Sequence, residues 1–283
     1  MPEVGVSLGT LISEGAEGLR RSGLLEAWRE AIRIWTELGR TPAQVYLERE
    51  QPVDPAEAVR FHEAIARRAR GEPLPHVTGR CGFRRLSLSS DGRALIPRPE
   101  TEGLVELLLQ RVGSGRVADI GTGSGCIALS LALEGAYDQV IAIDCSTEAL
   151  SLARNNRASA GARVSLIQAD LCAPLGAGTL DALISNPPYL TGAEYSSLES
   201  SVRDWEPALA LVSGADGMAA TTRLLDSGRE VVRPGGWLAL EVDCTRAAAA
   251  AAQASAFGWS EVTVHTDLFG RERYLLAQRS DTR

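Results

Sequence analysis

Apolar side chains recur every three or four positions in the first part of the chain, to about residue 71, and this spacing predicts amphipathic helices. The stretch 23–39 shows the spacing clearly, with an apolar face formed by Leu25, Trp28, Ile32 and Trp35. Two further helices are expected to begin at Thr41 and Asp54, because an N-cap acceptor followed by proline in the first turn favours helix initiation. We therefore expect a helical N-terminal domain over residues 1–74.

The hydrophobic pattern changes its period at about residue 80. The stretch "FRRLSLSS", the pair Asp91-Gly92 and the stretch "RALI" follow one another within residues 80–97. Two short strands joined by a tight Asp-Gly turn are typical of a β-hairpin. We expect this hairpin to form a linker over residues 75–98.

Short apolar runs then alternate with helical stretches to the end of the chain. The expected strands are 116–120, 140–144, 164–168, 180–185 and 236–242, with helices near 124–135 and 147–158. This alternation predicts a mostly parallel sheet with helices on both faces. The last two runs, 261–266 and 273–278, have no helix between them and should pair antiparallel at one side of the sheet. The pattern predicts an α/β domain over residues 99–283 with a seven-stranded sheet and an antiparallel last strand.

The composition narrows the class of protein. The 283 residues are 45% hydrophobic, yet no apolar stretch is long enough to span a bilayer. The N-terminus lacks the charged start and apolar core of a signal peptide. The five cysteines are scattered without a C-x-x-C pair, and this pattern favours reduced thiols in a cytoplasm. Neither the cysteines nor the three histidines have the spacing of metal ligands, so we expect no metal.

Charge is distributed unevenly along an acidic chain. The net charge of −7 and the pI of about 5.2 are the reverse of what a protein that grips a phosphate backbone usually carries. Residues 60–98, however, hold nine arginines against Glu63, Glu72 and Asp91, a local net charge of +6. This stretch is either a set of solvated faces or a docking surface for a negatively charged macromolecule.

A glycine-rich segment follows the first expected strand. In "DIGTGSGC" (119–126), Gly121, Gly123 and Gly125 lie between a strand and a helix, where a tight turn lets a ligand approach the backbone. Ligands of open α/β sheets bind beyond the carboxyl ends of the strands. Asp144 ends the second strand, 23 residues after Gly121, and its carboxylate can accept hydrogen bonds from ribose hydroxyls. This pair fits an enzyme that uses either a nicotinamide cofactor or S-adenosylmethionine (SAM). Asp170, after the third strand, is a candidate for contact with an adenine edge or, equally, for a helix or turn cap.

The sequence "SNPPYL" (185–190) follows the fourth expected strand, which should end beside the first. Proline has a fixed φ and no N–H, so Pro187 and Pro188 hold their carbonyl oxygens rigidly with few internal donors nearby. The side-chain oxygen of Asn186 and the backbone oxygen of Pro187 can together accept two hydrogen bonds from a planar –NH₂ group. Tyr189 can lie against the flat face of that group. The segment is either a rigid turn or a receptor for an amide or an aromatic amine.

Such a receptor has a chemical purpose. An amide nitrogen is a poor nucleophile because its lone pair is delocalised into the carbonyl. If both N–H groups are held by acceptors, the nitrogen can pyramidalise and aim its lone pair at a methyl sulfonium, and alignment of two reactants lowers a barrier by about 7–11 kcal/mol. A glutamate side chain would present oxygen to the same two acceptors and be repelled, which gives selectivity for the amide.

Several segments together resemble one known family, the peptide chain release factor glutamine-N5 methyltransferases. The match covers most of the chain, although the N-terminal helices match in kind rather than in letters. The segments that carry it, in order, are "RRARGEPLPHVTGRCGF" (67–83), "LIPRPETEGLVE" (95–106), "DIGTGSGCIALSLA", "SNPPYL", "WEPALAL" (205–211), "GADGM" (214–218), "RPGGWLALE" (233–241) and "DLFGRERYL" (267–275). The chain departs from the usual family residues at His76, Leu171, Asp243 and Arg246.

The resemblance implies a helical substrate-docking domain, a hairpin linker and a Rossmann-like SAM-dependent methyltransferase domain. It implies methylation of the side-chain amide nitrogen of the glutamine in the Gly-Gly-Gln loop of class 1 release factors, by a cytoplasmic monomer that binds neither a membrane nor nucleic acid directly. The residues implied to hold SAM are Gly121, Thr122, Gly123, Ser124, Gly125, Asp144, Asp170 and Leu171, with a contribution from Asn186. The residues implied to hold the glutamine amide are Asn186, Pro187, Pro188 and Tyr189.

Three other functions remain open at this point. A methyltransferase for a glutamine of a ribosomal protein would share the catalytic domain but should differ in its N-terminal region. An N6-adenine DNA methyltransferase would use the same acceptors on a flipped base, although the acidic balance and the lack of an obvious DNA-reading module argue against it. A non-catalytic SAM-binding or nicotinamide-binding scaffold would explain the glycine-rich segment but not the amide receptor.

Overall fold

The structure is a computed structural model that describes residues 6–280 of the 283. It forms two compact units with separate hydrophobic cores. The N-terminal unit contains the residues up to Arg80 together with Glu199–Trp205, and the larger unit contains Cys81–Leu198 and the residues from Glu206 onward. The boundaries expected at residues 74 and 98 stay predictions.

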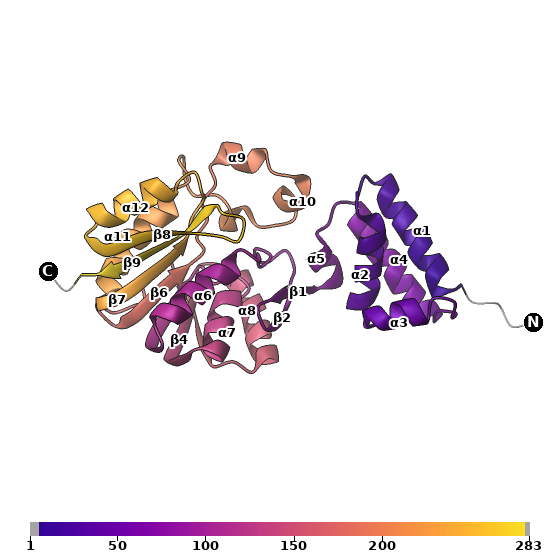
Figure 1. Cartoon of the computed structure of the whole chain (residues 1–283), viewed down its shortest axis with the longest axis horizontal. Coiled ribbons are helices and arrows are strands. Elements are labelled where there is room, and N and C mark those ends of the chain that lie inside the picture. The colour runs from indigo at the N-terminus through magenta and orange to yellow at the C-terminus, as the bar shows by residue number, and fades with distance from the viewer. Residues whose placement is uncertain (1–5, 281–283) are drawn as a thin grey trace, which may run out of the picture. The chain divides into compact units, whose positions relative to one another are not determined.

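The N-terminal unit is helical, as predicted. Its elements are α1 (Leu8–Arg21), α2 (Ala27–Glu37), α3 (Pro42–Leu47), α4 (Pro55–Ala69), α5 (Leu74–Thr78) and the short α10 (Ser200–Arg203) (Figure 1). Trp35 and Phe61 stack at the centre of the core with their ring centroids 4.6 Å apart. Gly15 lets α1 approach this stack, since a Cβ atom there would lie 2.7 Å from the Phe61 ring. Thr41 and Asp54 cap α3 and α4 as predicted, each accepting backbone hydrogen bonds.

The buried face of α2 differs from the expected one. Leu25 lies before the helix and is fully exposed, and the Trp28 side chain is 40% exposed. The buried residues of this helix are instead Ala27, Ala31, Ile34 and Trp35. The prediction was wrong for Leu25 and Trp28 but correct for Trp35, and Ile32 packs against the edge of the core. The error arose because the prediction followed the largest apolar side chains, whereas α2 packs largely through small residues.

The predicted hairpin exists, but its turn lies elsewhere. Strands β1 (Arg80–Phe83) and β2 (Leu86–Ser89) form a two-stranded sheet, so the turn falls at Arg84 and Arg85 rather than at Asp91-Gly92. The residues expected to form the second strand, 93–96, are not in a strand. Arg93 instead binds the carboxylate of Asp91 through its backbone and its guanidinium group.

Arg84 explains the position of this turn. It adopts a left-handed backbone conformation with φ of 48°, which is unusual for a residue with a side chain. Its N–H donates to Glu102 at 2.9 Å, and its guanidinium binds Glu134 at 2.8 Å and Glu106 at 2.9 Å. These partners lie on α6 (Thr101–Arg111) and α7 (Cys126–Glu134), so tertiary ion pairs select the turn and override the local Asp-Gly signal.

The larger unit contains the predicted seven-stranded sheet. Its strands are β3 (Ser114–Ile120), β4 (Ala136–Asp144), β5 (Val164–Gln168), β6 (Leu180–Ser185), β7 (Val232–Glu241), β8 (Trp259–Thr266) and β9 (Glu272–Arg279). Their order is β5-β4-β3-β6-β7-β9-β8. The strands from β3 to β7 pair in parallel, whereas β9 pairs antiparallel with both β7 and β8. The mostly parallel sheet with an antiparallel end is therefore confirmed.

Helices cover both faces of this sheet, as the alternating pattern predicted. Helices α11 (Ala219–Val231) and α12 (Ala247–Ala256) close one core, and α6 (Thr101–Arg111) and α7 (Cys126–Glu134) close the other (Figure 1). The remaining helical elements of the unit are α8 (Thr147–Ala160), α9 (Gly192–Ser196) and the short 3₁₀ helix η1 (Ala208–Ala210). Along β3, Val117 belongs to one core and Ile120 to the other. Within residues 6–280, no helix is both long enough and apolar enough to cross a membrane.

The strand order creates a switch point between β3 and β6. From β3 the chain passes to β4 and β5 on one side, and it then returns to β6 on the other side. Asp119 of β3 pairs with Ile184 of β6, which confirms that the fourth predicted strand ends beside the first. Ligands of open α/β sheets bind at such a point, beyond the carboxyl ends of the strands. The segments that follow β3 and β6 therefore lie where a ligand is expected.

Candidate active site

The glycine-rich segment after β3 needs its glycines for backbone geometry. Gly121, Gly123 and Gly125 have φ of 72°, 56° and 87°, a region that side chains strongly disfavour. The N–H groups of Gly121 and Thr122 both donate to the carbonyl of Ile143, at 2.8 and 3.0 Å. The loop therefore folds over the end of β4, next to Asp144.

Asp144 is fixed by two backbone hydrogen bonds. Its Oδ2 accepts the N–H of Gly123 at 2.8 Å, and its Oδ1 accepts the N–H of Ser146 at 2.9 Å. A carboxylate oxygen has more than one lone pair, so each oxygen can accept a further hydrogen bond. The side chain is half-buried and lines the pocket described below. Its position suits the acceptance of hydrogen bonds from ligand hydroxyls.

Two buried polar residues that received no role from the sequence hold this loop in place. Asp119 accepts the hydroxyl of Thr122 at 2.6 Å and the N–H of Ala128 at 3.1 Å. It is fully buried, and burial raises the pKa of its carboxyl to about 7. Asn156 of α8 donates to the carbonyl of Ser124 at 2.9 Å. The signal for Asp119 was its place at the end of a strand, directly before the glycines.

A pocket of about 340 Å³ opens at the switch point. The predicted site residues that line it are Gly121, Gly123, Asp144, Asp170, Leu171, Asn186 and Pro188. Further lining residues follow Glu206 and begin α11, namely Pro207, Leu209, Ala210, Val212, Ser213, Gly214, Ala219, Ala220 and Arg223. The predicted residues that do not line this pocket are Thr122, Ser124, Gly125, Pro187 and Tyr189. All of these assignments stay predictions, because the pocket shows where side chains lie and not what they bind.

Asp170 and Leu171 occupy the pocket rim after β5. Asp170 is exposed and forms an ion pair with Arg223 of α11, with 2.6 Å between Oδ2 and Nη2. Leu171 adopts a positive φ of 47° and turns the chain at this rim. The two residues thus place an acid and an apolar side chain beside Asp144, an arrangement suited to the edge and face of a planar ring.

The segment after β6 is tied down at both ends. The hydroxyl of Ser185 donates to the carbonyl of Ile120 at 2.6 Å, which anchors the start of the segment to the end of β3. At its far end, Leu190 donates to Leu211 at 2.9 Å and accepts from Ser213 at 2.8 Å. Between these anchors the two prolines restrict the backbone further. Asn186 is therefore held close to the glycine-rich loop.

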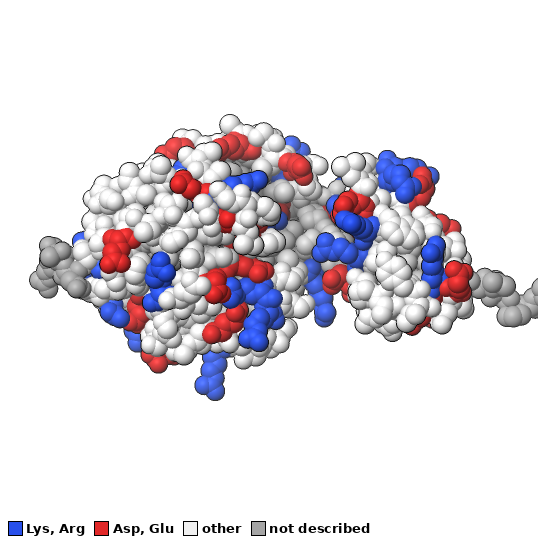
Figure 2. Space-filling view, in the orientation of Figure 1, with Lys and Arg blue, Asp and Glu red and all other residues white. Residues whose placement is uncertain are grey.

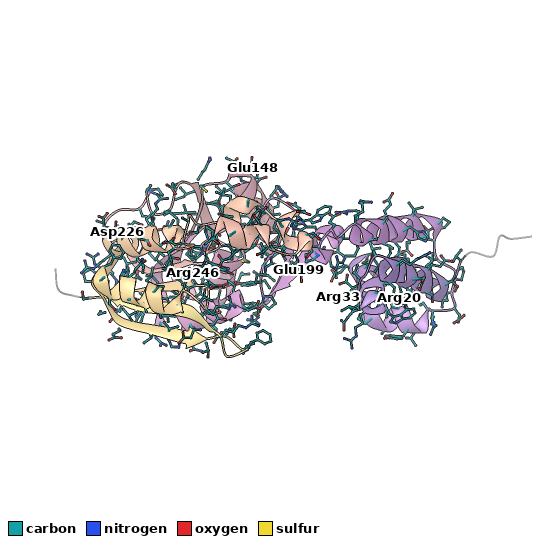
Figure 3. The ribbon with its side chains drawn as sticks, turned by 90° about the horizontal axis from the view of Figure 1, so that it is seen from above. Arg20, Arg33, Glu148, Glu199, Asp226 and Arg246 are labelled. Atoms are coloured by element: carbon teal, nitrogen blue, oxygen red, sulfur yellow. The ribbon has the colours of Figure 1, made fainter. Side chains whose placement is uncertain are left out.

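Gly217 leaves space for the backbone of the segment after β6. Gly217 has φ of 77°, and a Cβ atom there would lie 2.4 Å from the carbonyl oxygen of Tyr189. Arg246, labelled in Figure 3, lies in the same place: its Nε donates to the carbonyl of Asp216 at 2.8 Å, and its Nη2 binds Glu194 of α9 at 2.8 Å. Since α9 follows directly after Leu190, these contacts fix the chain beyond the prolines.

The amide of Asn186 faces a short chain of buried hydrogen bonds. Its Nδ2 donates to the hydroxyl oxygen of Thr101 at 3.1 Å, and the Thr101 hydroxyl donates to the carboxyl of Glu241 at 2.7 Å. Thr101 and Glu241 are 2% and 1% exposed. Among residues 6–280, no hydrogen-bond donor reaches the side-chain oxygen of Asn186 or the carbonyl of Pro187. Asn186, which lines the pocket, therefore keeps a side-chain acceptor oxygen without a partner among the described residues, whereas Pro187 is buried and does not line the pocket.

Tyr189 cannot act as a base near neutral pH. Burial and the nearby carboxyl of Glu241 raise the pKa of its phenol to about 12, so the phenol keeps its proton. Within the part of the chain that the structure describes, no cluster of three or more histidine, cysteine or acidic side chains could hold a metal ion. The site therefore offers acceptors and positioning groups rather than an obvious strong base.

The arginine-rich stretch 60–98 is neutralised to a large extent by the fold. Ion pairs join Arg67 to Glu72, Arg68 to Glu30, Arg84 to Glu134, Arg93 to Asp91 and Arg98 to Glu206. Basic and acidic residues accordingly lie next to one another on the face seen in Figure 2. No acidic group within residues 6–280 forms an ion pair with Arg60, Arg70, Arg80 or Arg85. Five of the nine arginines in this stretch are therefore paired with acidic side chains.

Comparisons with known proteins place this fold and site in a class. Residues 99–203 match the family described as "Methyltransferase small domain", and residues 10–79 match the "PrmC N-terminal domain". A methyltransferase from Pyrococcus furiosus has a similar fold, with a TM-score of 0.54 and 19% identity over 70% of this chain and 91% of that chain. The fold, this domain match and the relatives described next show a SAM-dependent methyltransferase.

Curated relatives identify the family within this class. The chain is 38% identical to the release factor glutamine methyltransferase of Deinococcus radiodurans, over 97% of this chain and 99% of that protein. It is 43% identical to the protein of the same name from Moorella thermoacetica, over 82% of this chain and 84% of that protein. The chain belongs to the release factor glutamine methyltransferase family.

Proposed function

We propose that this enzyme transfers a methyl group from SAM to the side-chain amide nitrogen of the glutamine in the Gly-Gly-Gln loop of a class 1 release factor. Membership of the family supports the reaction and the cofactor. One observation carries the assignment of the site: Asn186, with a free side-chain oxygen, lines the same pocket as Gly121 and Asp144. A methyl donor and an amide would therefore meet at one place.

The residues on the β3–β4 side of the pocket fit the cofactor. The fixed carboxylate of Asp144 suits the two hydroxyls of a ribose, and the left-handed glycines let a ligand approach the loop backbone closely. Leu171 and the wall from Pro207 to Val212 offer apolar surface to an adenine ring. When bound, SAM supplies an activated methyl group on a positively charged sulfur.

The residues on the β6 side fit a carboxamide. The side-chain oxygen of Asn186 and the carbonyl of Pro187 can each accept one N–H of the glutamine –NH₂ group. A glutamate side chain has no such hydrogens and would place a negative oxygen against two acceptors. The pair therefore both binds the amide and discriminates against the acid.

Positioning is the main contribution of this chain to the reaction. Holding both N–H groups directs the nitrogen lone pair out of conjugation, and alignment of two reactants is worth about 7–11 kcal/mol. Tyr189 stays protonated, since its pKa is raised to about 12, so it packs against the amide rather than accepting its proton. The proton that the methylated nitrogen loses passes to water.

The N-terminal unit is the candidate for docking the protein substrate. It matches the family's own N-terminal domain, and it exposes apolar side chains, with Tyr46 69% and Leu47 83% exposed. Large exposed apolar side chains often mark protein–protein contacts. Replacing both by serine should raise KM for the release factor and leave the affinity for SAM unchanged. An unchanged KM would show that Tyr46 and Leu47 do not form the docking surface.

Because its substrate takes part in translation, we place the enzyme in the cytoplasm. We also propose that it acts as a monomer.

The central test is mass spectrometry of a class 1 release factor incubated with the enzyme and SAM. We expect one added methyl group, on the peptide that contains Gly-Gly-Gln. A release factor with glutamate in place of this glutamine is the matched control and should gain none. A ribosomal protein and an adenine-containing DNA, incubated in parallel, test the two other acceptors. Methyl transfer to either of them, with none to the release factor, would overturn the proposal.

A further inference from the structure

Three residues far apart in the sequence form a line of hydrogen bonds that ends at the proposed amide receptor. Asn186 follows β6, Thr101 is the first residue of α6, and Glu241 is the last residue of β7. The bonds run from Asn186 Nδ2 to Thr101 at 3.1 Å and from the Thr101 hydroxyl to Glu241 at 2.7 Å. We propose that Thr101 and Glu241 are positioning residues that fix which end of the Asn186 amide faces the substrate. This inference rests on the proposed function.

The direction of the Asn186 amide decides whether the receptor works. The two ends of an asparagine amide have nearly the same shape, but the oxygen accepts hydrogen bonds and the NH₂ donates them. A half-turn of the amide would place its NH₂ against the N–H groups of the substrate. No hydrogen bond could then form at that position, and only the carbonyl of Pro187 would remain as an acceptor. The site must therefore impose one of the two orientations.

The line of hydrogen bonds imposes this orientation because it ends at the carboxylate of Glu241. An ionised Glu241 can only accept, so the single hydroxyl proton of Thr101 must point toward it. The Thr101 oxygen then has only lone pairs to offer Asn186, and only the NH₂ end of the amide can bind there. Thr101 and Glu241 are 2% and 1% exposed, so water does not compete for these groups. The oxygen of Asn186 is left facing the pocket.

The surrounding structure keeps Thr101 in place. The hydroxyl of Tyr274 on β9 donates to the carbonyl of Glu100 at 2.5 Å, directly before α6. Gly103 makes room for this contact, since a Cβ atom there would lie 2.5 Å from the same hydroxyl. The start of α6 is thus anchored to the sheet that carries Glu241, and the 2.7 Å bond does not depend on a mobile helix end.

Protonation of Glu241 should loosen this orientation. A neutral carboxyl can donate to Thr101, whose own proton is then free to point toward the oxygen of Asn186. Burial raises the pKa of Glu241 to about 7, while Arg273, with its Nη1 atom 3.9 Å from the carboxyl, favours the charged form. The other titratable groups that act on this carboxyl are Arg98 and Glu100 before α6, Tyr189 after β6 and Tyr274 on β9. Asp267 in turn binds Arg273 at 2.8 Å.

Substitutions at Thr101 separate positioning from packing. Thr101→Val keeps the shape of the side chain but removes the hydroxyl, whereas Thr101→Ser keeps the hydroxyl. We expect Thr101→Val to lower kcat for release factor methylation about 10- to 100-fold, the effect of a lost buried hydrogen-bond partner. Thr101→Ser should restore kcat to within about threefold, and the affinity for SAM, measured by calorimetry, should change less than about threefold in both.

Glu241→Gln supplies an independent test, because glutamine resembles the protonated acid and can donate to Thr101. For the wild-type enzyme, kcat should rise with pH through about 7, the pKa of Glu241. The variant should show a reduced kcat without this rise. Thr222→Val is the control, since Thr222 also shares a side-chain hydrogen bond, with Gln253 at 2.9 Å, but does not line the pocket. Its kcat and pH profile should match those of the wild type.

The outcomes separate this inference from the proposed function. A wild-type enzyme that leaves the release factor unmethylated would overturn the proposed function itself. Wild-type methylation together with an unchanged kcat in folded Thr101→Val would overturn the inference alone. If Thr101→Val does not bind SAM or does not fold, the Glu241→Gln variant tests the positioning role instead. A wild-type kcat and a wild-type pH profile in this variant would reject the role. A reduced kcat that does not rise with pH would support it.

Discussion

The two sides of the pocket are built in different ways. On the β3–β4 side, the backbone sets the shape of the loop through three glycines with positive φ, and its N–H groups bind Ile143 and hold the Asp144 carboxylate in place. On the β6 side, it comes from side chains and prolines, with Asn186 oriented through Thr101. The glycine-rich loop depends on its backbone conformation, so it should be sensitive to substitutions that strain the backbone. The β6 side depends on particular functional groups, so it should be sensitive to the loss of a single polar atom.

This difference fits the two ligands. SAM presents many groups over a large surface, so its binding is spread over several contacts and no one side chain should be indispensable. A carboxamide offers only two hydrogens to the receptor, so each acceptor carries a large share of the recognition. We therefore expect substitutions on the β6 side to affect kcat and those on the β3–β4 side to affect the affinity for SAM.

The largest effect should come from Asn186→Ala. Removing one of the two acceptors should lower kcat by about 10²- to 10³-fold, as for the loss of one preorganised group at other reacting centres. The affinity for SAM, measured by calorimetry, should stay within a few-fold, because Asp144 and the glycine loop are unaffected. Asn155→Ala is a matched control on the exposed side of α8 and should leave both quantities unchanged. Substantial turnover by Asn186→Ala would remove the distinction between the two sides.

Asp144→Ala tests the cofactor side and should have the next largest effect. The loss of a fixed carboxylate acceptor should weaken SAM binding about 10- to 100-fold, since hydrogen bonds to charged groups are worth about 1.5–3 kcal/mol. At saturating SAM, kcat should fall much less. Asp138→Ala, on an exposed position of the same strand β4, is the control. Unchanged SAM affinity in Asp144→Ala would count against the assignment of this carboxylate to the ribose.

Much of the fold followed from local patterns, as two strands illustrate. The expected ranges 164–168 and 180–185 are the ranges observed for β5 and β6. Both are short apolar runs bounded by polar or turn residues, so their periodicity alone defines them. The neighbouring positions of β3 and β6, and hence the place of Asn186 beside the glycine loop, followed from the rules of parallel sheets.

The sequence could not reveal features that depend on distant partners. The hairpin turn moved because Arg84 binds Glu134, which is 50 residues away. The orientation of Asn186 depends on Thr101, 85 residues away, and on Glu241 beyond it. No spacing or propensity signals such a line of bonds. These are also the contacts that most affect the candidate site, because they decide which atom of a predicted residue faces the ligand.

Gly217→Ala should have a moderate effect on the β6 side, through the backbone. Its Cβ atom would lie 2.4 Å from the Tyr189 carbonyl, in addition to the cost of a positive φ. Gly270→Ala measures the cost of the positive φ alone, because Gly270 has a similar φ of 75° and no atom within 4 Å of its Cβ position. Positive φ alone costs about 1–3 kcal/mol, so we expect Gly217→Ala to lose more unfolding free energy than Gly270→Ala and to lower kcat about tenfold. If urea denaturation showed equal losses of unfolding free energy in Gly217→Ala and Gly270→Ala, the segment around Tyr189 would be able to shift and relieve the steric contact at little cost.

The smallest effect is expected from Asp170→Asn, which tests whether the cofactor side is distributed as proposed. Asp170 and Arg223 form an exposed ion pair, with side chains 63% and 59% exposed, and such pairs contribute about 0–1 kcal/mol to stability. The substitution keeps an oxygen acceptor at the rim but removes its charge, so SAM affinity should fall by no more than about threefold. Arg223→Gln serves as the partner control, because it releases the charged Asp170 carboxylate without changing it. If Asp170→Asn instead weakened SAM binding as strongly as Asp144→Ala, this one carboxylate would hold the adenine, and recognition on the β3–β4 side would be as concentrated as on the β6 side.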